Sequence, residues 1–392
     1  MIQIDAKREN GALTLLLSGR IDSTNAADAE KKIKELTADV TDELTIDADP
    51  LTYISSAGLR VILRLKKTHQ SLKIINVSPE VYEIFDMTGF TEMMDISKAY
   101  RKISIDGCEV IGEGANGIVY RIDADTIVKV YKNHDALAEI HNERELARKA
   151  FVMGIPTAIP YDVVQVGDLY GSVFELLNAK SFAKLMIEDP ANTEDYAKQS
   201  VDILKTIHST ILQPGELPDK KAEAMVWAEF CKDHLPEEIG SKLVSLIRDI
   251  PDTLNMLHGD YHIKNIMRQN DENLLIDMDT LSMGHPIFEF AAIYLAYIGF
   301  SCIDHENVKR FLGIPYEQAG RFWKATLRYY FNTDDEAVLQ DIEQKAAVIG
   351  FARILRRTYR KAKESEAYKE KLIDYCKKTL YDLVPKTESL AF

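Results

Sequence analysis

Three oxygen-bearing side chains follow one another at short intervals in the second half of the chain. Asn265 comes five residues after Asp260, and Asp277 comes twelve residues after Asn265, at the end of an apolar run. Carboxylate and amide oxygens suit Mg²⁺, which takes few ligands from protein because phosphates and waters complete its octahedron. The spacing predicts that Asn265 and Asp277 hold a nucleotide-bound Mg²⁺, while Asp260 accepts the proton of an acceptor hydroxyl. A capped turn is the structural alternative for the two aspartates.

A glycine-rich segment lies upstream, with glycines at Gly112, Gly114 and Gly117. Glycines at these spacings let a backbone hairpin approach phosphates without clashes from Cβ atoms, and its NH groups can bind phosphate oxygens. A dinucleotide-binding fingerprint would require a helix directly after the last glycine. Residues 118–122 are instead the β-like run Ile-Val-Tyr-Arg-Ile, which favours a phosphate-binding loop between two strands.

One lysine, Lys129, interrupts the apolar, β-branched run 127–131. An unpaired buried ammonium is costly, so Lys129 needs an anionic partner, and nucleotide phosphate plus a helix carboxylate would provide it. A lysine on an edge strand that reaches solvent is the alternative. The helix expected over 136–151 offers Glu143, which shares a face with apolar residues and is favoured to point inward. Glu145 remains a second possible partner.

The order of these features resembles the protein-kinase-like fold in its aminoglycoside phosphotransferase and choline kinase branch. His258-Gly259-Asp260 stands where protein kinases have His-Arg-Asp, and Ile276-Asp277-Met278-Asp279 replaces the Asp-Phe-Gly stretch. No Ala-Pro-Glu motif follows at the expected place. Gly284-His285-Pro286-Ile287-Phe288-Glu289 instead resembles the Gly-Asp-Pro…Asp segment of the phosphotransferases, with His and Glu substituting. These departures point to a small-molecule kinase.

The resemblance implies an α+β bilobal domain with an N-lobe over about residues 103–177 and a helical C-lobe over about 178–392. Glu175 and Leu177 would lie in the hinge between the lobes, whose backbone meets adenine in this family. The C-lobe would build the acceptor pocket, in which acidic residues hold cationic aminoglycosides or choline.

Two charged runs in the C-lobe could contribute to that pocket. Asp334, Asp335 and Glu336 lie beside the aromatic run 329–331, which could form a recess for an ammonium group, although a solvated loop is favoured. The basic run 353–363 would indicate an anionic ligand if it converged on a cleft. A solvated helix face is the more common structure for such a run.

The first 98 residues are predicted to form a separate α/β domain, a mixed sheet with helices. Strands are expected over 2–7, 12–17, 44–48 and 72–77. The Asn10-Gly11 pair is a strong signal for a hairpin turn between the first two strands. Helices are expected over about 22–36, 56–69 and 80–88. Asp22 or Ser23 would cap the first helix.

Ser55 and Ser56 stand at the start of the second expected helix. A helix N-terminus can receive a phosphate group through its free NH groups and positive dipole end, so a serine there could act as a switch. A plain N-cap is the alternative. The surrounding segments resemble a STAS domain of the bacterial anti-sigma-factor-antagonist type; they are Ser18-Gly19-Arg20-Ile21-Asp22, Asp49-Pro50-Leu51, Ile54-Ser55-Ser56-Ala57-Gly58-Leu59 and Phe85-Asp86-Met87-Thr88-Gly89-Phe90.

That resemblance makes Ser56 a phosphorylation candidate, because the family's phosphorylated serine lies two residues before the Gly-Leu pair. The family commonly has Asp directly before this serine, whereas this chain has Ser55. The resemblance also implies a protein partner, such as an anti-sigma factor.

Charge and composition exclude several other classes. The net charge of −14 argues against a nucleic-acid binder, which needs a cationic face. The longest uncharged apolar segment, 290–303, is shorter than the roughly 20 residues that span a bilayer, so it is predicted to be core. The first ten residues lack the apolar stretch of a secretory signal. The four cysteines lie far apart, which predicts buried free thiols rather than a zinc site or disulfides.

These features predict a cytoplasmic chain with domains at 1–98 and 99–392, the second a Mg·ATP-dependent phosphotransferase acting on a hydroxyl of a small molecule. The acceptor would be an aminoglycoside, a choline-like compound or a sugar. Two alternatives belong to the signalling and binding classes. In the first, the kinase domain phosphorylates Ser56 or a partner protein. In the second, it is a nucleotide-gated scaffold whose STAS domain engages the partner.

Overall fold

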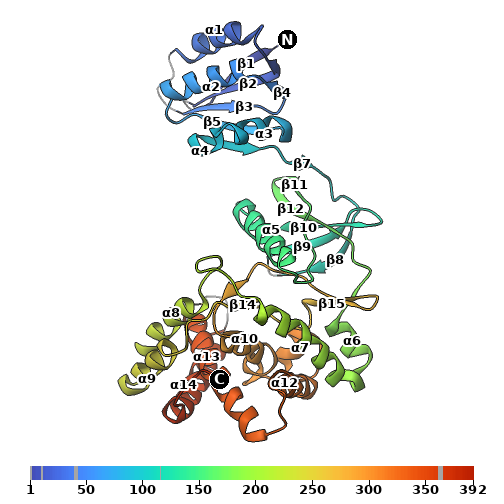
Figure 1. The fold of residues 1–392 in the computed structure, drawn as a ribbon, viewed down its shortest axis with the longest axis vertical. Helices are drawn as coiled ribbons and strands as arrows, with labels where there is room; N and C mark the ends of the chain where they lie inside the picture. The colour runs from blue at the N-terminus through green and yellow to red at the C-terminus, as the bar shows by residue number, and fades with distance from the viewer. Residues whose placement is uncertain (1, 10–11, 39–42, 115, 361–364) are drawn as a thin grey trace. The chain divides into compact units, whose positions relative to one another are not determined.

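The computed structural model describes residues 2–9, 12–38, 43–114, 116–360 and 365–392. The chain divides into two compact units (Figure 1). The first comprises residues 1–106 and 163–170, and the second comprises 107–162 and 171–392. Each unit has its own hydrophobic core. The division falls after residue 106, whereas the sequence analysis expected a boundary after residue 98. A short hairpin segment, residues 163–170, groups with the first unit.

The first unit contains a mixed sheet with helices, which confirms the predicted fold class. Its elements are β1 (Gln3–Glu9), β2 (Ala12–Ile21), α1 (Ala26–Thr37), β3 (Leu44–Asp47), β4 (Leu51–Ile54), α2 (Ser56–Thr68), β5 (Lys73–Val77), α3 (Pro79–Met87), α4 (Phe90–Met93), β6 (Asp95–Lys98) and β7 (Arg101–Lys102). Strands β1 and β2 are antiparallel, and β2, β3, β5 and β6 follow in parallel, with β4 also parallel to β2. The predicted turn residues Asn10 and Gly11 lie outside the described residues.

Two local details of the first unit differ from the sequence prediction. Helix α1 begins at Ala26, after the predicted start, because Asp22 accepts the backbone NH of Thr24 at 3.0 Å and stabilises a turn before the helix. The short strands β4 and β6 were not predicted, since four residues give little alternation to detect. The core of the unit includes Ile33, Ile62 and Phe85, one from each of the first three helices.

The second unit begins with an antiparallel sheet, in which β8, β9, β10 and β12 are neighbours in that order. The elements of this part are β8 (Glu109–Glu113), β9 (Gly117–Arg121), β10 (Thr126–Tyr131), α5 (Leu137–Val152) and, from residue 171 onward, β12 (Leu169–Glu175). Strand β11 (Asp162–Val166) and the start of β12 form the hairpin segment that groups with the first unit. The predicted glycine loop therefore lies between β8 and β9, and Lys129 lies on a central strand. Helix α5 runs alongside this sheet (Figure 1).

The rest of the second unit is predominantly helical, as predicted. Its helices are α6 (Phe182–Glu188), α7 (Thr193–Ser209), α8 (Lys220–Lys232), α9 (Glu237–Arg248), α10 (Ile287–Tyr297), α11 (Glu306–Leu312), α12 (Tyr316–Phe331), α13 (Glu336–Arg360) and α14 (Glu366–Leu383). Short strands form two small sheets among them: β13 (Lys180–Ser181) with β15 (Ile266–Gln269) and β16 (Glu272–Leu275), and β14 (Met256–Leu257) with β17 (Ser282–Met283). The loops after β14 and β16 carry the residues singled out in the sequence.

Helix α10 lies inside the helical core, and every one of its residues except Ala292 is buried. It covers most of the apolar segment 290–303, so the prediction that this segment is core is confirmed. Among the described residues, none of the helices combines the length and apolar character that crossing a bilayer requires. All four cysteines lie in described segments as free thiols, but only Cys231 and Cys376 are buried.

Candidate active site

Lys129 pairs with a carboxylate on the neighbouring helix. Its Nζ lies 3.0 Å from each carboxylate oxygen of Glu143 on α5. Only 6% of the Glu143 side chain is exposed, whereas the Glu145 side chain is 59% exposed and pairs with Lys149 on its own helix. The structure therefore selects Glu143 over Glu145. Because β10 has a paired strand on each side, Lys129 is not an edge-strand residue.

A second layer of polar contacts supports this ion pair. The Tyr131 hydroxyl donates to Glu143 and lies 3.5 Å from the Ser172 hydroxyl. Burial raises the pKa of Tyr131, so its hydroxyl keeps the proton that it donates. Burial alone would lower the pKa of Lys129, but the carboxylates of Glu143 and Asp277 outweigh it and raise that pKa above its ordinary value. The lysine is therefore a permanent cation in a partly enclosed site.

The glycine loop combines one tightly packed glycine with two glycines at which a Cβ would make only ordinary van der Waals contacts. A Cβ at Gly117 would lie 2.7 Å from the carbonyl oxygen of Val130, so only glycine lets β9 approach β10 this closely. At Gly112 and Gly114 the nearest atoms would be 3.8 and 3.9 Å away, which leaves room beside the backbone. The loop closes through a hydrogen bond from Gly114 N to Gly117 O at 2.9 Å. Ala115 lies outside the described residues.

Asp260 stands on a turn whose backbone is strongly constrained. Gly259 has φ +84°, and a Cβ there would lie 2.4 Å from the carbonyl oxygen of Thr280. The Asp260 side chain is 51% exposed, and Nε2 of His262 lies 3.5 Å from its Oδ2. Burial would raise the pKa of Asp260, but the hydrogen bond and charge of His262 outweigh it and lower that pKa. Asp260 is therefore an ionised, accessible carboxylate that can accept a proton.

Asn265 and Asp277 lie side by side, next to this turn. Asn265 donates its side-chain NH to the backbone carbonyl oxygen of Asp260 at 3.1 Å, and the backbone carbonyl oxygen of Asn265 accepts the NH of Ile276 at 3.0 Å. Asp277 has φ +66°, a strained conformation that is concentrated at functional sites. Its buried Oδ1 has no hydrogen-bond partner within the described ranges and lies 3.6 Å from Lys129 Nζ. The Asn265 amide oxygen and the Asp277 carboxylate fit a small oxygen-liganded cation.

The two residues predicted for the hinge lie where β12 ends. Glu175 is the last residue of the strand and is exposed, and Leu177 is half-buried. The NH of Leu176 between them donates to Asp125 O at 2.7 Å. Their role toward adenine stays a prediction. The structure does bring Lys129 and Glu143 from the sheet side together with Asp277 from the helical part.

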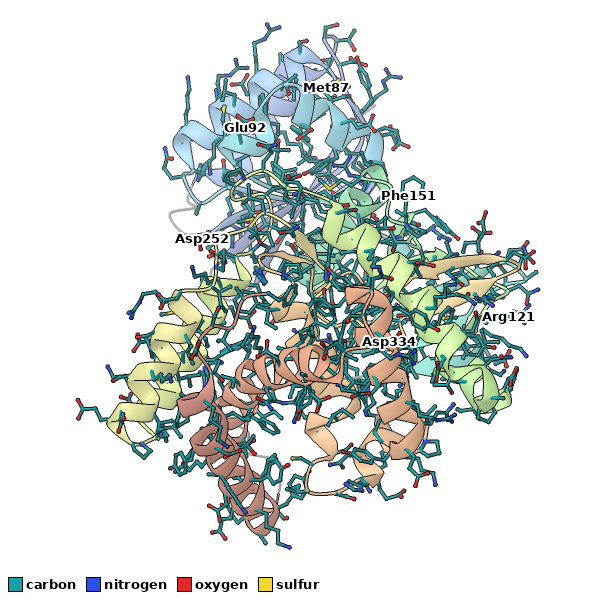
Figure 2. The ribbon with its side chains drawn as sticks, turned by 60° about the horizontal axis from the view of Figure 1, so that its bottom comes forward. Met87, Glu92, Arg121, Phe151, Asp252 and Asp334 are labelled. Atoms are coloured by element: carbon teal, nitrogen blue, oxygen red, sulfur yellow. The ribbon has the colours of Figure 1, made fainter. Side chains whose placement is uncertain are left out.

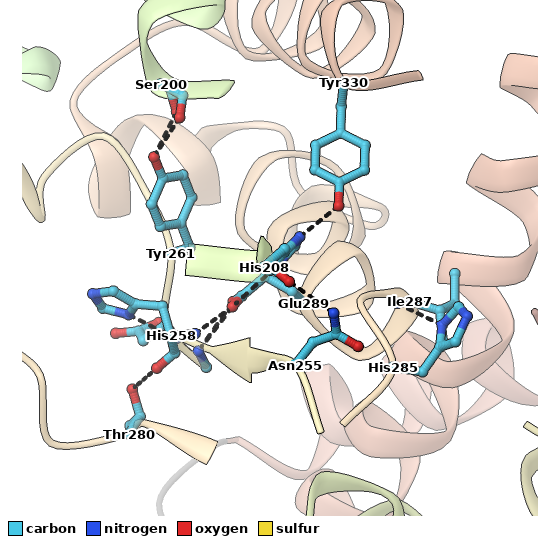
Figure 3. A network of polar contacts seen from close by, with 12 residues as sticks. Ser200, His208, Asn255, His258, Tyr261, Thr280, His285, Ile287, Glu289 and Tyr330 are labelled. Carbon is cyan, nitrogen blue, oxygen red and sulfur yellow. Dashed lines mark hydrogen bonds and ion pairs between the residues drawn. The ribbon is translucent and has the colours of Figure 1, made fainter. Parts of the chain in front are cut away.

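Glu289 holds the Asp260 turn in place, a role that sequence reasoning missed (Figure 3). It lies fully buried on α10, where its carboxylate accepts the backbone NH groups of His258 and Gly259. His208 Nε2 lies 3.9 Å away. Burial would raise the pKa of Glu289, but His208 and the NH of His258 outweigh it and lower that pKa. The motif around Glu289 was visible in the sequence, but nothing in its spacing revealed this contact.

Asp279 is a further acidic group that the sequence analysis left without a role. Burial, together with the charges of Asp277 and Glu143, raises the pKa of Asp279 to about 7. Its position two residues after Asp277 was the available signal, because two acidic groups this close in sequence also lie close in space and repel each other. The site therefore concentrates negative charge, as a site for a metal cation or a cationic side chain would.

The aromatic and acidic recess that was considered for an ammonium group is not formed, because the pocket lined by Asp334 and Glu336 is also lined by Arg321, Lys324 and Arg328. The Asp334 side chain is 81% exposed (Figure 2) and accepts from Arg328 Nε at 2.6 Å, and Glu336 lies 3.8 Å from Lys324. The rings of residues 329–331 pack against the helical core instead. The favoured expectation of a solvated loop describes this segment correctly.

The basic run 353–363 is not a uniform solvated face. Arg353 is half-buried and lies over the ring of Trp227 at 5.5 Å, whereas Arg357 and Arg360 are exposed, the former over the ring of Phe300 at 5.1 Å. Residues 353–360 belong to α13, whose inner face packs on α8 and α10. Lys361 and Lys363 lie outside the described residues.

The two serines of the first unit have different environments. Ser55 is the N-cap of α2, since its hydroxyl accepts the NH of Gly58 at 3.4 Å. Ser56 is the first residue of the helix and is exposed. The plain N-cap therefore accounts for Ser55 but leaves the Ser56 hydroxyl accessible.

Known proteins are similar to the two parts of the chain separately. Residues 3–103 match the family model of the STAS domain. The putative anti-sigma factor antagonist BtrV of Bordetella bronchiseptica is 30% identical over 94 residues, which are 23% of this chain and 81% of that protein. The anti-sigma-B factor antagonist of Bacillus subtilis is 31% identical over 100 residues, 24% of this chain and 91% of that protein.

Solved structures similar to the chain have low sequence identity. The aminoglycoside phosphotransferase APH(2'')-Ib with ADP is 15% identical, with coverage of 77% of this chain and 98% of that one and a TM-score of 0.48. A choline/ethanolamine kinase family protein of Mesorhizobium loti is 13% identical, with coverage of 70% and 88% and a TM-score of 0.43. Residues 107–323, more than half of the chain and including every candidate residue of the second unit, match the family model of the phosphotransferase enzymes. The chain belongs to the phosphotransferase enzyme family and carries an N-terminal STAS domain.

Proposed function

We propose that the second unit transfers the γ-phosphoryl group of ATP to a hydroxyl group of a small molecule. The observation that carries this proposal is the ion-paired set at the site: Lys129 contacts both Glu143 and Asp277, one from each side of the site. Asp277 follows Ile276, whose NH donates to the backbone carbonyl oxygen of Asn265, and the Asn265 side chain in turn donates to the carbonyl oxygen of Asp260. Phosphoryl transfer depends mainly on positioning and on charge neutralisation, and these residues can supply both.

The residues would divide the work as follows. Lys129, kept charged and oriented by Glu143, binds phosphate oxygens, and the backbone NH groups around Gly112 and Gly114 do the same from the loop. Asp260 orients the acceptor hydroxyl and accepts its proton. The acceptor oxygen forms a bond to the γ-phosphorus while the bond between that phosphorus and the β–γ bridging oxygen breaks. The bridging oxygen keeps the electron pair and leaves as part of ADP.

Asn265 and Asp277 would hold Mg²⁺, which when bound neutralises part of the phosphate charge. Oδ1 of Asp277, which has no hydrogen-bond partner in the part of the chain that the structure describes, supports this assignment. The backbone around Glu175 and Leu177 would bind adenine. We place the reaction in the cytoplasm, where Mg·ATP is abundant.

Calorimetry with Mg·ATP tests the nucleotide half of this proposal, and ADP release over a panel of hydroxylated amines, sugars and aminoglycosides tests the transfer. Asp260→Ala serves as the blank, because it removes the proton acceptor without touching Lys129. We expect saturable nucleotide binding in both proteins and acceptor-dependent ADP release in the wild type alone. A protein that binds no nucleotide, or a blank with wild-type turnover, would contradict the proposal.

The exposed hydroxyl of Ser56 supports a second function, for the first unit. We propose that the STAS domain docks a protein partner of the anti-sigma-factor class, and that phosphate on Ser56 regulates this docking. The added charge would lie at the N-terminus of α2, where the helix dipole favours an anion.

The source of that phosphate can be tested directly. Phosphopeptide mass spectrometry after incubation with Mg·ATP should find phosphate on Ser56 and none in Asp260→Ala, if the second unit acts on the first. Ser55→Ala is the matched control, since it removes a neighbouring hydroxyl but leaves Ser56. An unmodified Ser56 in the wild type would rule out phosphorylation by this chain.

A further inference from the structure

The two oxygens of the Asp260 carboxylate have different surroundings. Nε2 of His262 lies 3.5 Å from Oδ2, whereas Oδ1 has no hydrogen-bond partner within the described residues. The Asp260 side chain is 51% exposed, so its unoccupied oxygen can meet a substrate. One oxygen of the proposed proton acceptor is therefore covered by a histidine, and the other is free.

The His262 side chain is held firmly, although the carboxylate beside it is half exposed. Only 6% of the side chain is exposed. The ring of Phe311 on α11 packs against the imidazole, with 5.0 Å between the centroids and an angle of 89° between the planes. The carbonyl oxygen of His262 accepts the NH of Asn265 at 2.9 Å, which fixes the backbone of the turn. Packing and backbone geometry together set the direction of the ring.

Only one of the two ring nitrogens of His262 has a suitable place for a proton. Nδ1 is buried and lacks a hydrogen-bond partner in the part of the chain that the structure describes. A proton there would be a buried donor without an acceptor, which is costly. If Nδ1 alone carried the proton, the lone pair of Nε2 would also point at the Asp260 carboxylate and be repelled by it. The proton therefore belongs on Nε2, where Oδ2 accepts it.

The neighbouring polar side chains do not replace His262 in this contact. His258 meets only the backbone of Asp260, whose NH donates to His258 Nδ1 at 3.4 Å. Lys264 is exposed, and its Nζ lies 5.8 Å from the centroid of the Phe311 ring rather than at the carboxylate. Within the described ranges, His262 is the one side chain in contact with the carboxylate of Asp260.

We propose that His262 is a positioning residue for the transfer: its Nε2–H donates to Oδ2 of Asp260 and so reserves Oδ1 for the acceptor hydroxyl. This inference rests on the proposed phosphotransferase function and deepens it. The last torsion of an aspartate side chain is broad, so a carboxylate without a donor at one oxygen has no fixed orientation. Catalytic hydrogen bonds are often long without substrate and shorten in the complex, which fits the distance of 3.5 Å.

The proton balance of the step is simple. As the acceptor oxygen forms its bond to the γ-phosphorus, the hydroxyl proton passes to Oδ1 of Asp260. His262 keeps its own proton on Nε2 throughout. The proton on Oδ1 passes to water after the product leaves, which restores the ionised carboxylate.

Two amides of different length test which ring nitrogen matters. The side-chain NH₂ of Gln reaches about as far as Nε2 of His, whereas that of Asn reaches only as far as Nδ1. His262→Asn should lower kcat by at least about 10-fold, the value of one hydrogen bond to a charged group, and leave the KM for ATP unchanged. His262→Gln should restore most of kcat. Equal losses in two variants that bind ATP like the wild type would contradict the assignment.

His234→Asn is the matched control for these variants. His234 on α8 also packs between aromatic rings, with centroids 4.4 Å from Phe230 and 4.3 Å from Tyr359. Within the described residues it has no hydrogen bond or ion pair with the Asp260 turn. Its substitution should keep the wild-type kcat, and a loss equal to that of His262→Asn would count against a specific role of His262.

Nuclear magnetic resonance reads the position of the proton without turnover and without a variant that must be active. Nitrogen-15 shifts distinguish protonated from unprotonated ring nitrogens, and the full chain has only nine histidines to label. The signals of His262 are those that disappear in His262→Gln. We expect Nε2 to be protonated at neutral pH, and an unprotonated Nε2 would overturn the inference.

The two measurements separate failure of this inference from failure of the proposed function. If no acceptor supports ADP release by the wild type, the proposed transfer fails, while the spectrum still decides whether His262 donates through Nε2. If the wild type transfers phosphate and His262→Asn keeps its kcat, the proposed function stands and the inference about His262 is overturned.

Discussion

Replacing Glu289 by Gln tests whether this carboxylate positions the Asp260 turn. The substitution keeps the size of the side chain and removes its charge. In the structure the carboxylate accepts the backbone NH groups of His258 and Gly259, directly before Asp260, and it is fully buried (Figure 3). The amide oxygen of Gln can still accept both NH groups, but without the charge that strengthens them.

The expected loss follows from the two hydrogen bonds. A hydrogen bond to a charged group contributes about 1.5–3 kcal/mol and a neutral one about 0.5–1.5 kcal/mol, so removing the charge costs about 1 kcal/mol per bond. Glu289→Gln should therefore lower the free energy of unfolding by about 2 kcal/mol. A small displacement of Asp260 is costly in rate, because misplacement by about 1 Å can cost about 100-fold. We expect kcat to fall by at least about 10-fold while the KM for ATP stays the same.

Chemical denaturation and steady-state turnover measure the two effects. Glu343→Gln is the matched control, because Glu343 also accepts a hydrogen bond, a partly buried one from Trp323 Nε1 at 2.7 Å, but lies on α13 and within the described residues has no hydrogen bond to the Asp260 turn. The control should lose stability and keep its kcat. If Glu289→Gln keeps wild-type kcat, or if both variants lose kcat equally, Glu289 is not a positioning residue.

The pH dependence of stability provides a second check on Glu289. Its pKa in the folded protein is lower than its ordinary value, because His208 and the NH of His258 outweigh the effect of burial. The carboxylate therefore stabilises the fold fully above its unfolded pKa of about 4.5, and this contribution is lost as the pH falls through the lower, folded pKa. The difference in stability between wild type and Glu289→Gln should shrink on acidification below about pH 4.5. A constant difference would contradict the assigned pKa direction.

Three further predictions concern the sheet side of the site and the first unit. Gly117→Ala should lower the free energy of unfolding by about 1–3 kcal/mol, since the new Cβ would lie 2.7 Å from Val130 O. Gly114→Ala is the control and should keep the stability of the wild type, because its Cβ has room. Thermal unfolding measures both variants. Lys129→Met should weaken ATP binding by at least about 10-fold in calorimetry and also lower the free energy of unfolding, because it leaves the buried Glu143 carboxylate without its cation. Hydrogen bonds from Arg64 and Lys34 lower the pKa of Glu30 to about 2. Glu30→Gln should therefore have a lower free energy of unfolding than the wild type above about pH 4.5, and this difference should disappear as the pH falls from about 4.5 to 2.

Residues of the site could be predicted where local geometry and chemistry are coupled. Lys129 was recognisable because a charged residue in a β-branched strand must have a partner, and helical periodicity then selected Glu143. Asp260, Asn265 and Asp277 were recognisable because three oxygen-bearing side chains follow at short intervals, and the hairpin β15–β16 between Asn265 and Asp277 brings these two back together. In both cases the constraint operates within a short stretch of chain.

Contacts between distant segments could not be predicted in the same way. The Glu289 carboxylate meets the NH groups of residues 258 and 259 only because α10 packs beneath the turn, and helix packing leaves no periodic trace in sequence. The start of α1 was misplaced for a related reason. Asp22 has the chemistry of an N-cap, but its carboxylate accepts the backbone NH of Thr24 in the turn before the helix. An N-cap and a turn contact of this kind both place an Asp shortly before a helical pattern, so the sequence does not distinguish them.

The charge of the acceptor shows how this limit affects a functional conclusion. The acidic segment 334–336 was considered as a recess for an ammonium group, yet Asp334 pairs with Arg328 and Glu336 pairs with Lys324 on the surface. The charges around Trp227 are mixed: Lys220 and Arg353 lie over its ring, from helices far apart in the chain, and Glu223 pairs with Lys220. A ligand responds to the charges within a few ångströms of it, because solvent screens the rest. The field at a pocket is therefore set by the helices that pack together there, and the sum over the chain can have the opposite sign.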